Sequence, residues 1–391
     1  MDFAIIIRIF AQTSKACKYM ITRTLETLIR ERTGKGKAII VFGARQVGKT
    51  TLLRQIADSN ETLWLNGDEP DVRALFDNAS STRLKAIIGP QQNIVIDEAQ
   101  RIPNIGISLK LIIDNNPDVQ VFATGSSSFD LANVINEPFT GRKYELQMYP
   151  LSFGELAAHN GLLDEKRMLP QRLVYGSYPD VVNHSGEERE VLQELANSYL
   201  YKDILMFDRV KKSEKIVKLL QAIAFQIGSE VSYNELAQLC GLDPKTVDSY
   251  IQLLEKAFII FRLPSFSRNL RNELKFAKKI YFWDCGIRNA VIGNFLQAET
   301  RLDICALFEN YVIAERLKQQ SYARSFVKSY FWRTSAKQEI DYVEEDNGQL
   351  TAYEFKWNPR KKASVPPSFA RSYPDAEYNT ITRENYYEIL L

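Results

Sequence analysis

The stretch that decides the fold reads Gly43-Ala44-Arg45-Gln46-Val47-Gly48-Lys49-Thr50. It matches the pattern G-x-x-x-x-G-K-[ST] and stands between an apolar run and a helical pattern that starts at Thr51. The glycines let the backbone curl, so that consecutive N–H groups and the N-terminus of the next helix face phosphate oxygens. Lys49 brings positive charge to the β- and γ-phosphates, and Thr50 offers its hydroxyl to Mg²⁺. The sequence therefore predicts that residues 43–51 bind ATP together with Mg²⁺.

Short apolar runs indicate the sheet that carries this loop. They lie at residues 38–42, 62–65, 93–96 and 119–123 and alternate with helical patterns. Short runs rich in β-branched residues are typical of parallel strands that helices cover on both faces. We therefore expect an α/β domain with the loop at the carboxyl end of its first strand.

Two acids, Asp97 and Glu98, directly follow the third of these runs, where ligands of open α/β folds bind. We expect Asp97 to hold Mg²⁺, directly or through water, and Glu98 to orient or deprotonate the attacking water. The phosphate loop earlier in the chain makes this pairing specific. The fourth run leads into Thr124-Gly125-Ser126-Ser127, where a short hydroxyl could sense the γ-phosphate or simply belong to a turn.

Length and composition limit what the rest of the chain can be. The 391 residues exceed what one hydrophobic core usually serves, and 45% hydrophobic content can fill two or three domains. With Lys+Arg 50 against Asp+Glu 48, a histone-like wrapper and an acidic tail are excluded, and any nucleic-acid surface must be local. Four scattered cysteines and two histidines argue against zinc fingers and disulfide scaffolds. A reducing, cytoplasmic setting fits this composition.

The chain shows no pattern of a membrane anchor. Residues 3–10 are apolar but are interrupted by Arg8, and no later apolar stretch approaches the length of a membrane span. We therefore expect no membrane partner. Met20 is the more natural start, because the first helical pattern, at residues 24–32, follows it.

Residues 232–256 have the spacing of a helix-turn-helix. Ser232 can cap a first helix, Gly241 supplies the turn, and Asp243 can cap a second helix. Residues 258–263 would then form the first strand of a wing. The second helix carries as many acids as lysines, which argues against strong binding in the major groove.

The segment 262–279, in contrast, is basic and could hold a DNA backbone without reading its sequence. Its cations are Arg262, Arg268, Arg271, Lys275, Lys278 and Lys279, against the single acid Glu273. The alternative is a winged-helix module that packs domains or subunits together, and the neutral second helix slightly favours it.

Two period-two strand patterns near the C-terminus flank Asn347-Gly348, the preferred pair for a type I′ hairpin turn. This turn fixes which residues face each other across the hairpin: Asp346 and Gln349, Asp341 and Glu354, and Glu339 and Lys356.

Carboxylates that face each other, as Asp341 and Glu354 would, repel unless a cation or a proton lies between them. Oxygen ligands of this kind suit Mg²⁺ or Mn²⁺. The alternative is a hairpin with one solvated, charged face. Both interpretations stay open on these residues alone.

Several motifs together resemble a prokaryotic family of AAA-type ATPases in which the ATPase domain is fused to a C-terminal domain of unknown function. They are residues 43–50, Ile96-Asp97-Glu98-Ala99-Gln100, Thr124-Gly125-Ser126-Ser127-Ser128, Gly141-Arg142 and Pro150-Leu151-Ser152-Phe153. The resemblance covers nearly the whole chain from Met20 onward. It implies that Ser126 occupies the sensor position. It also implies that Arg142 serves as an arginine finger, in cis or from a neighbouring subunit, so a homo-oligomer is one expected assembly.

A second resemblance concerns the C-terminal hairpin. Its D…E-x-K arrangement resembles the restriction-endonuclease-like nuclease core, in which the acids hold metal and the lysine supports the attacking water. Glu309, in the preceding helical pattern, matches the helical acid of that core. By resemblance, a second metal or nuclease-like site would comprise Glu309, Asp341, Glu354 and Lys356, although such domains can keep the fold after losing catalysis.

These observations predict an α/β chain with an AAA-type P-loop NTPase domain at residues 20–150 and a helical lid or linker at 151–212. A winged-helix domain at 213–280 and a restriction-endonuclease-like α/β domain at 281–391 follow. The leading hypothesis is Mg-dependent ATP hydrolysis that switches or powers the C-terminal module, with DNA as one candidate target. The alternatives are an ATP-gated DNA-binding regulator and a metal-dependent nuclease.

Overall fold

The computed structural model describes residues 20–57, 60–126, 139, 141–206, 213–267, 278–361 and 363–391. Some residues discussed above lie outside this part of the chain: those before Met20, Ser127, Ser128, Arg268, Arg271, Glu273 and Lys275. Among the described helices, none is long and apolar enough to cross a membrane.

Five parallel strands form the first sheet, in the order β2-β3-β4-β1-β5. Their bounds are Ala38–Phe42 (β1), Thr62–Asn66 (β2), Asn93–Asp97 (β3), Gln120–Gly125 (β4) and Lys143–Gln147 (β5). β1 and β4 are buried along their whole length, as expected for central strands covered on both faces. The predicted parallel α/β fold is confirmed. β5 lies at the edge, and its charged, half-exposed sequence gave no strand signal.

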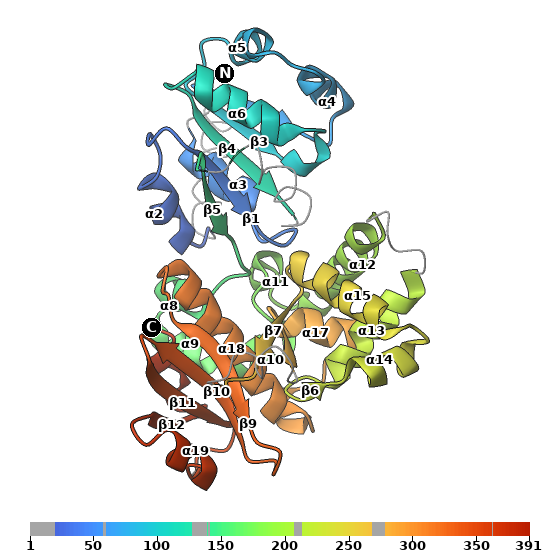
Figure 1. Ribbon diagram of the computed structural model, residues 1–391, viewed down its shortest axis with the longest axis vertical. Coiled ribbons are helices and arrows are strands. Elements are labelled where there is room, and N and C mark those ends of the chain that lie inside the picture. Colours follow the sequence, from blue (N-terminus) through green and yellow to red (C-terminus); the bar gives the residue numbers. More distant parts are fainter. Residues whose placement is uncertain are drawn as a thin grey trace, which may run out of the picture.

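The helices of this part follow the strands in the predicted alternation. They are α2 (Thr24–Arg30), α3 (Lys49–Ile56), α4 (Pro70–Phe76), α5 (Ser81–Ile88) and α6 (Ile105–Asn115), with a 3-10 turn, η1, at Ala99–Arg101. Figure 1 shows this unit in blue to teal at one end of the long axis, joined to the rest through the segment that follows β5.

A series of helices follows and forms a helical unit. Its helices are α8 (Phe153–Asn160), α9 (Leu162–Arg167), α10 (Leu169–Tyr175), α11 (Pro179–Asn183), α12 (Glu188–Met206), α13 (Ser213–Phe225) and α17 (Cys285–Ile292). In Figure 1, α8 and α9 lie at the left beside α18 (Ile304–Tyr322), whereas α12, α13 and α17 lie at the right. α17 packs against α10, α12 and α13, although the chain reaches it only after residue 284. The buried Asn289 fastens this contact, because its Nδ2 donates to the carbonyls of Leu173 (2.9 Å) and Val174 (2.8 Å).

Two capped helices and a small sheet form the middle of the chain, where the winged helix was predicted. Ser232 caps α14 and Asp243 caps α15, as expected, and Gly241 between them has a φ of 61°. The helices are α14 (Tyr233–Cys240) and α15 (Pro244–Lys256), and an antiparallel sheet β6-β8-β7 is built from Glu230–Val231 (β6), Ile260–Pro264 (β7) and Lys278–Phe282 (β8).

Two cations of the predicted DNA-facing segment are engaged inside the protein. Arg262 forms ion pairs with Asp248 (3.1 Å) and Glu255 (2.5 Å) on α15. Lys279 is buried, with its side chain 1% exposed. The expectation that Arg262 and Lys279 face DNA is therefore wrong. The sequence shows that these residues are charged, but it does not show that acids from neighbouring elements neutralise them.

The C-terminal part consists of a long helix, α18 (Ile304–Tyr322), on a sheet of order β12-β11-β10-β9. The strands are Lys328–Arg333 (β9), Glu339–Asp346 (β10), Gln349–Lys356 (β11) and Glu377–Thr382 (β12), and β12 pairs parallel to β11. The predicted turn is present, with φ of 50° at Asn347 and 89° at Gly348. Asp346 pairs with Gln349, as the turn requires.

One side chain joins α18 to the middle sheet. Asn310 is fully buried and bonds both backbone groups of Phe282 at the end of β8: its Oδ1 accepts from the N–H (2.7 Å) and its Nδ2 donates to the carbonyl (3.0 Å). A single side-chain amide thus supplies the two backbone hydrogen bonds that a further strand would otherwise make with Phe282.

Asn310→Leu is expected to destabilise this junction by about 2–4 kcal/mol, because two buried backbone groups lose their partner while the side-chain volume is kept. The measurement is the midpoint of thermal unfolding followed by circular dichroism. Asn115→Leu, at an exposed helix end, is the control and should shift the midpoint little. Equal shifts for both variants would contradict the assignment.

Candidate functional site

The phosphate loop, residues 43–48, joins β1 to α3 and approaches the chain that follows β5. A Cβ at Gly43 would lie 2.2 Å from the carbonyl oxygen of Met148, so only glycine fits there. Gly48 has a φ of 97°, which glycine adopts without strain. Lys49 is 5% exposed, and its Nζ donates to the carbonyls of Gly43 (2.7 Å) and Ala44 (2.8 Å). The ammonium group is thus held along the loop.

The predicted metal ligands lie together. Thr50, at the start of α3, donates its hydroxyl to Asp97 Oδ2 at the end of β3 (2.8 Å). β4 separates β1 from β3 in the sheet, so the two residues meet only because parallel strands present their carboxyl ends at one edge. A hydroxyl and a carboxylate oxygen are ligands that suit Mg²⁺.

Thr124 was predicted only as one of several hydroxyls after the fourth apolar run, and the structure places it within β4, next to its last residue. It is fully buried, donates to Asp97 Oδ1 and accepts from the backbone N–H of Glu98 (3.1 Å). Its hydroxyl therefore fixes the orientation of the Asp97 carboxylate. The available signal in the sequence was a threonine that directly follows the apolar run at residues 119–123.

Glu98 and Ser126 are linked by a residue that had no predicted role. Gln100 Nε2 donates to Glu98 Oε2 (2.6 Å) and to Ser126 Oγ (3.0 Å). Gln100 Oε1 is buried and has no hydrogen-bond partner within the described part of the chain. The predicted water-activating acid and the predicted sensor hydroxyl are thus two ends of one hydrogen-bonded chain.

Arg142 lies far from these residues. Its carbonyl accepts from the N–H of Ala38 (2.9 Å), at the amino end of β1, and its Nε pairs with Asp114 (2.6 Å). The phosphate loop leaves the opposite end of β1, which at about 3.3 Å per residue is more than 10 Å away. Arg142 therefore does not act on the phosphate loop in cis in this structure, and the role from a neighbouring subunit stays a prediction.

Arg23 is a buried residue that the sequence did not identify. It is 6% exposed and donates from Nη1 to the carbonyl of Val47 in the loop (2.7 Å) and from Nη2 to that of Tyr149 (2.6 Å). Its Nε pairs with Glu155 (3.1 Å). Glu155 and Ser152 form a capping box at the start of α8, and the pattern Ser152-x-x-Glu155 was the available signal.

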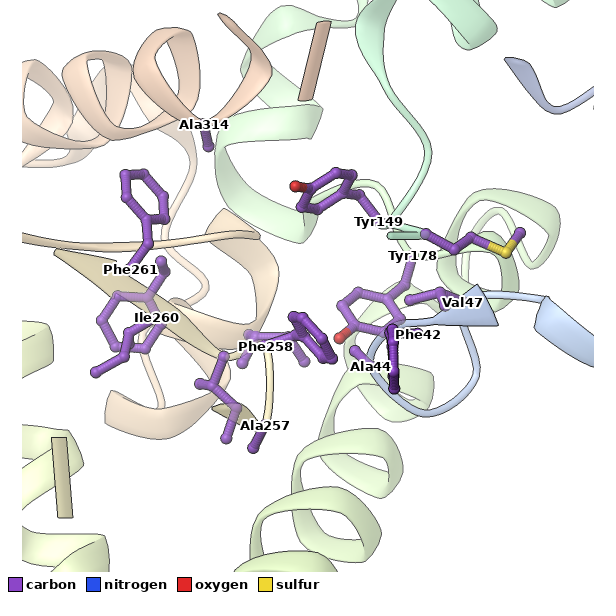
Figure 2. Packing of buried hydrophobic residues seen from close by; sticks show 14 of the residues in the cluster. Phe42, Ala44, Val47, Tyr149, Tyr178, Ala257, Phe258, Ile260, Phe261 and Ala314 are labelled. Atoms are coloured by element: carbon purple, nitrogen blue, oxygen red, sulfur yellow. The ribbon is translucent and has the colours of Figure 1, made fainter. Parts of the chain in front are cut away.

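A cavity of about 300 Å³ lies beside the loop, between the first unit and α11. Its lining is mostly apolar: Met20, Ile21, Arg23, Val47, Gly48, Thr51, Leu52, Gln55, Met148, Leu151, Pro179 and Asn183. Figure 2 shows that the loop residues Ala44 and Val47 belong to the same packed cluster as Tyr149, Tyr178 and Phe258. The loop is therefore packed against later parts of the chain.

The second predicted site is assembled differently from the expectation. Lys356 Nζ pairs with Glu354 Oε1 (2.6 Å), and Asp341 Oδ2 accepts from the N–H of Phe355 (2.9 Å). Burial, together with the charges of Glu309 and Glu354, raises the pKa of Asp341 to about 8. Burial likewise raises the pKa of Glu309.

The carboxylate cluster is, however, neutralised by Lys279. Lys279 Nζ contacts Glu309 (3.3 Å) and Glu339 (2.5 Å). Over the residues that the structure describes, no group of three or more His, Cys, Asp or Glu side chains is placed to hold a metal ion. The site predicted from Glu309, Asp341, Glu354 and Lys356 therefore stays a prediction.

Comparison with known proteins divides the chain into three matched regions. Residues 35–157 match an AAA domain, residues 166–298 a domain of unknown function (DUF8612) and residues 305–388 another domain of unknown function (DUF4143). The chain is an AAA-type P-loop ATPase domain fused to a C-terminal domain of unknown function. The resemblance to this ATPase family is confirmed.

The curated relatives are distant and uncharacterized. A protein of Mycobacterium tuberculosis is 24% identical over 366 residues, which covers 92% of this chain and 78% of the relative. One of Methanocaldococcus jannaschii is 21% identical over 369 residues, covering 88% and 80%. Among solved structures, a signal transduction ATPase with a tetratricopeptide repeat sensor from Pyrococcus horikoshii aligns with a TM-score of 0.30, 11% identity and coverage of 78% and 48%. That score is too low to carry an argument.

The raised pKa of Asp341 makes stability depend on pH. The folded-state pKa lies above the ordinary 3.8, so the folded chain binds the proton more tightly, and the free energy of unfolding falls as pH rises toward about 8. Asp341→Asn should weaken this fall, measured as unfolding midpoints between about pH 5 and about pH 9. Asp346→Asn, at the exposed hairpin tip, is the control. A pH dependence that Asp341→Asn leaves unchanged would refute the assignment.

Proposed function

We propose that this protein binds and hydrolyses ATP with Mg²⁺, and that the ATP cycle switches or powers the C-terminal module. The observation that carries the proposal is the meeting of Lys49, Thr50, Asp97 and Glu98 at one edge of the sheet. It joins a phosphate-binding loop, a pair of Mg²⁺ ligands and a water-activating acid. The AAA domain match over residues 35–157 supports the nucleotide-binding part of the proposal.

The loop and the start of α3 would bind the phosphates. Backbone N–H groups of residues 43–51 and the Lys49 ammonium supply donors and positive charge there. Thr50 and Asp97 would hold Mg²⁺, which neutralises negative charge on the phosphate oxygens. Thr124 supports this arrangement, because its bond to Asp97 Oδ1 leaves the other carboxylate oxygen directed at Thr50.

Glu98 would take the proton of the attacking water, and Ser126 would report the γ-phosphate. Gln100 contacts both residues, so a change in the partners of Ser126 also changes the partners of Glu98. We expect this link to keep the base restrained until the γ-phosphate is in place. Any arginine finger from Arg142 would come from a second copy of the chain.

The cavity beside the loop suits the base of the nucleotide. Ile21, Leu52, Met148, Leu151 and Pro179 offer apolar contacts to the faces of an aromatic ring system. Asn183 and Gln55 add amide groups that can pair with the edge of a base. Because α11 lines this cavity, a nucleotide bound there would contact α11, and binding would affect the helical unit.

Buried contacts join the loop to α18 and support the switching part of the proposal. The segment that follows β5 carries Tyr149, whose carbonyl accepts from Arg23 and whose N–H donates to the Tyr322 hydroxyl (3.2 Å). The N–H of Phe153 donates to Glu315 Oε2 (2.6 Å). Tyr322 and Glu315 lie on α18, so a shift of the loop passes through Arg23 to the C-terminal part.

The middle unit would connect domains rather than grip DNA through Arg262 and Lys279. Arg262 and Lys279 are paired inside the protein, which favours the packing role over the DNA-binding one. Turnover measured with and without double-stranded DNA at two salt concentrations decides the target. Stimulation that high salt removes would indicate DNA, because phosphate contacts release counterions. Turnover indifferent to DNA would point to a protein partner.

Lys49→Ala is expected to lose most ATP affinity, since it removes the charge at the phosphates. Glu98→Gln should still bind ATP while turnover falls on the order of 10²–10⁴-fold. Calorimetry with Mg·ATP and an assay of phosphate release measure the two effects, with the exposed Glu61→Gln as control. Unchanged binding and turnover in Lys49→Ala would refute the assignment.

Arg23→Met should uncouple α18 from the nucleotide. Hydrogen exchange of the α18 amides is expected to change on adding an ATP analogue to the wild type and to lose this response in the variant. Arg30→Met, which removes an exposed ion pair with Glu26, is the matched control and should keep the response. If Arg23→Met binds the analogue and α18 still responds, the route through Arg23 is wrong.

A further inference from the structure

Lys279 is a buried cation surrounded by acids from another part of the chain. It belongs to β8 of the middle sheet, and its side chain is 1% exposed. Its Nζ contacts Glu339 Oε1 of β10 (2.5 Å) and Glu309 Oε1 of α18 (3.3 Å). Asp341 also acts on it electrostatically, and the ring of Phe331 lies 5.5 Å from the ammonium.

This lysine stays charged despite its burial. Burial alone lowers the pKa of a lysine, because the charged form loses its water. Here Glu309, Asp341 and Glu339 more than offset that effect and raise the pKa of Lys279 above its ordinary value. The cluster therefore contains a permanent positive charge supplied by the protein itself.

Neighbouring groups also engage some of the carboxylate oxygens around Lys279. The Tyr281 hydroxyl donates to Glu309 Oε1 (2.6 Å), and Arg333 lies 3.7 Å from Glu339 Oε2. Lys356 pairs with Glu354 Oε1. Glu354 Oε2 is a buried oxygen without a hydrogen-bond partner in the described part of the chain. The oxygens of Glu309 and Glu339 that lie nearest to Lys279 are thus engaged by groups of the protein itself.

We propose that Lys279 is a built-in counter-cation that takes the place of the divalent metal in this nuclease-like cluster, so that the native cluster binds no Mg²⁺ or Mn²⁺. The acids instead fasten the middle sheet to the C-terminal part. This inference stands apart from the ATPase proposal, because it involves no residue of the phosphate site.

The position of the ion pairs supports a fastening role. Lys279 reaches from β8 to α18 and β10. A second ion pair joins Arg333 of β9 to Glu230 of β6 (3.0 Å), and here the C-terminal part supplies the cation and the middle sheet the acid. Both pairs join the middle sheet to the C-terminal part. A metal ion in the cluster would have to displace the first of them.

Removing the ammonium should convert the cluster into a cation site. Lys279→Met replaces the lysine with an unbranched apolar side chain of similar length. It leaves Glu309, Glu339 and Asp341 without their cation. Repulsion among buried carboxylates then favours uptake of a divalent ion. Lys278 precedes Lys279 in β8 and takes no part in the ion pairs described above. Lys278→Met is therefore the matched control.

The test titrates Mn²⁺ alone into full-length protein and follows it by electron paramagnetic resonance. All proteins carry Asp97→Asn, which removes the carboxylate that would hold Mg²⁺ at the phosphate site. The background and its Lys278→Met variant are expected to show no Mn²⁺ site that depends on Asp341. The Lys279→Met variant should gain one, and adding Asp341→Asn should abolish it.

Two results would overturn the proposal. In the first, the background itself binds Mn²⁺ and loses it on Asp341→Asn, which would make the cluster a native metal site. In the second, a folded Lys279→Met protein gains no Mn²⁺ site. If Lys279→Met fails to fold, comparing the background with its Asp341→Asn variant still decides whether the native cluster takes a metal.

Discussion

The guanidinium of Arg23 is the contact on which the arrangement of this protein most depends. It is buried against two backbone carbonyls and one carboxylate, and each comes from a different segment: the phosphate loop, the chain after β5 and the first turn of α8. A buried charge is tolerated only while its partners stay in place, and removing one partner of such a pair costs about 3–5 kcal/mol. Arg23 therefore ties the shape of the loop to the path of the chain that leaves the sheet.

Sheet topology explains the rest of the phosphate site. Thr50, Asp97 and Thr124 come from three different strand ends, and they meet because all strands run in one direction. The same rule sends Arg142 to the opposite edge, because it directly precedes β5, whereas the other three lie at or after the carboxyl ends of β1, β3 and β4. Position before or after a parallel strand thus decides whether a polar residue can take part in the site.

Much of this could be predicted, for physical reasons that differ by residue. The loop, Asp97 and Glu98 follow from local spacing, and the Asn347-Gly348 turn predicted the hairpin pairing that the structure shows from Asp346 and Gln349 as far as Tyr342 and Tyr353. Gln100, Thr124 and Arg23 act through partners far away in the chain, which no local pattern reveals. Lys279 was misassigned because charge along a sequence does not tell whether a side chain faces water or a ring of acids. β5 was missed because an edge strand needs no apolar run.

The separation of Arg142 from the phosphate loop has a consequence for symmetry. A subunit that offered its arginine edge to the loop edge of the next would use two unlike surfaces, so the contact could not be a two-fold one. Repeating such a contact rotates each copy relative to the last, and the assembly either closes as a ring or continues as an open helix. The terminal copies of an open helix would leave one loop unpaired, whereas a ring would complete every site.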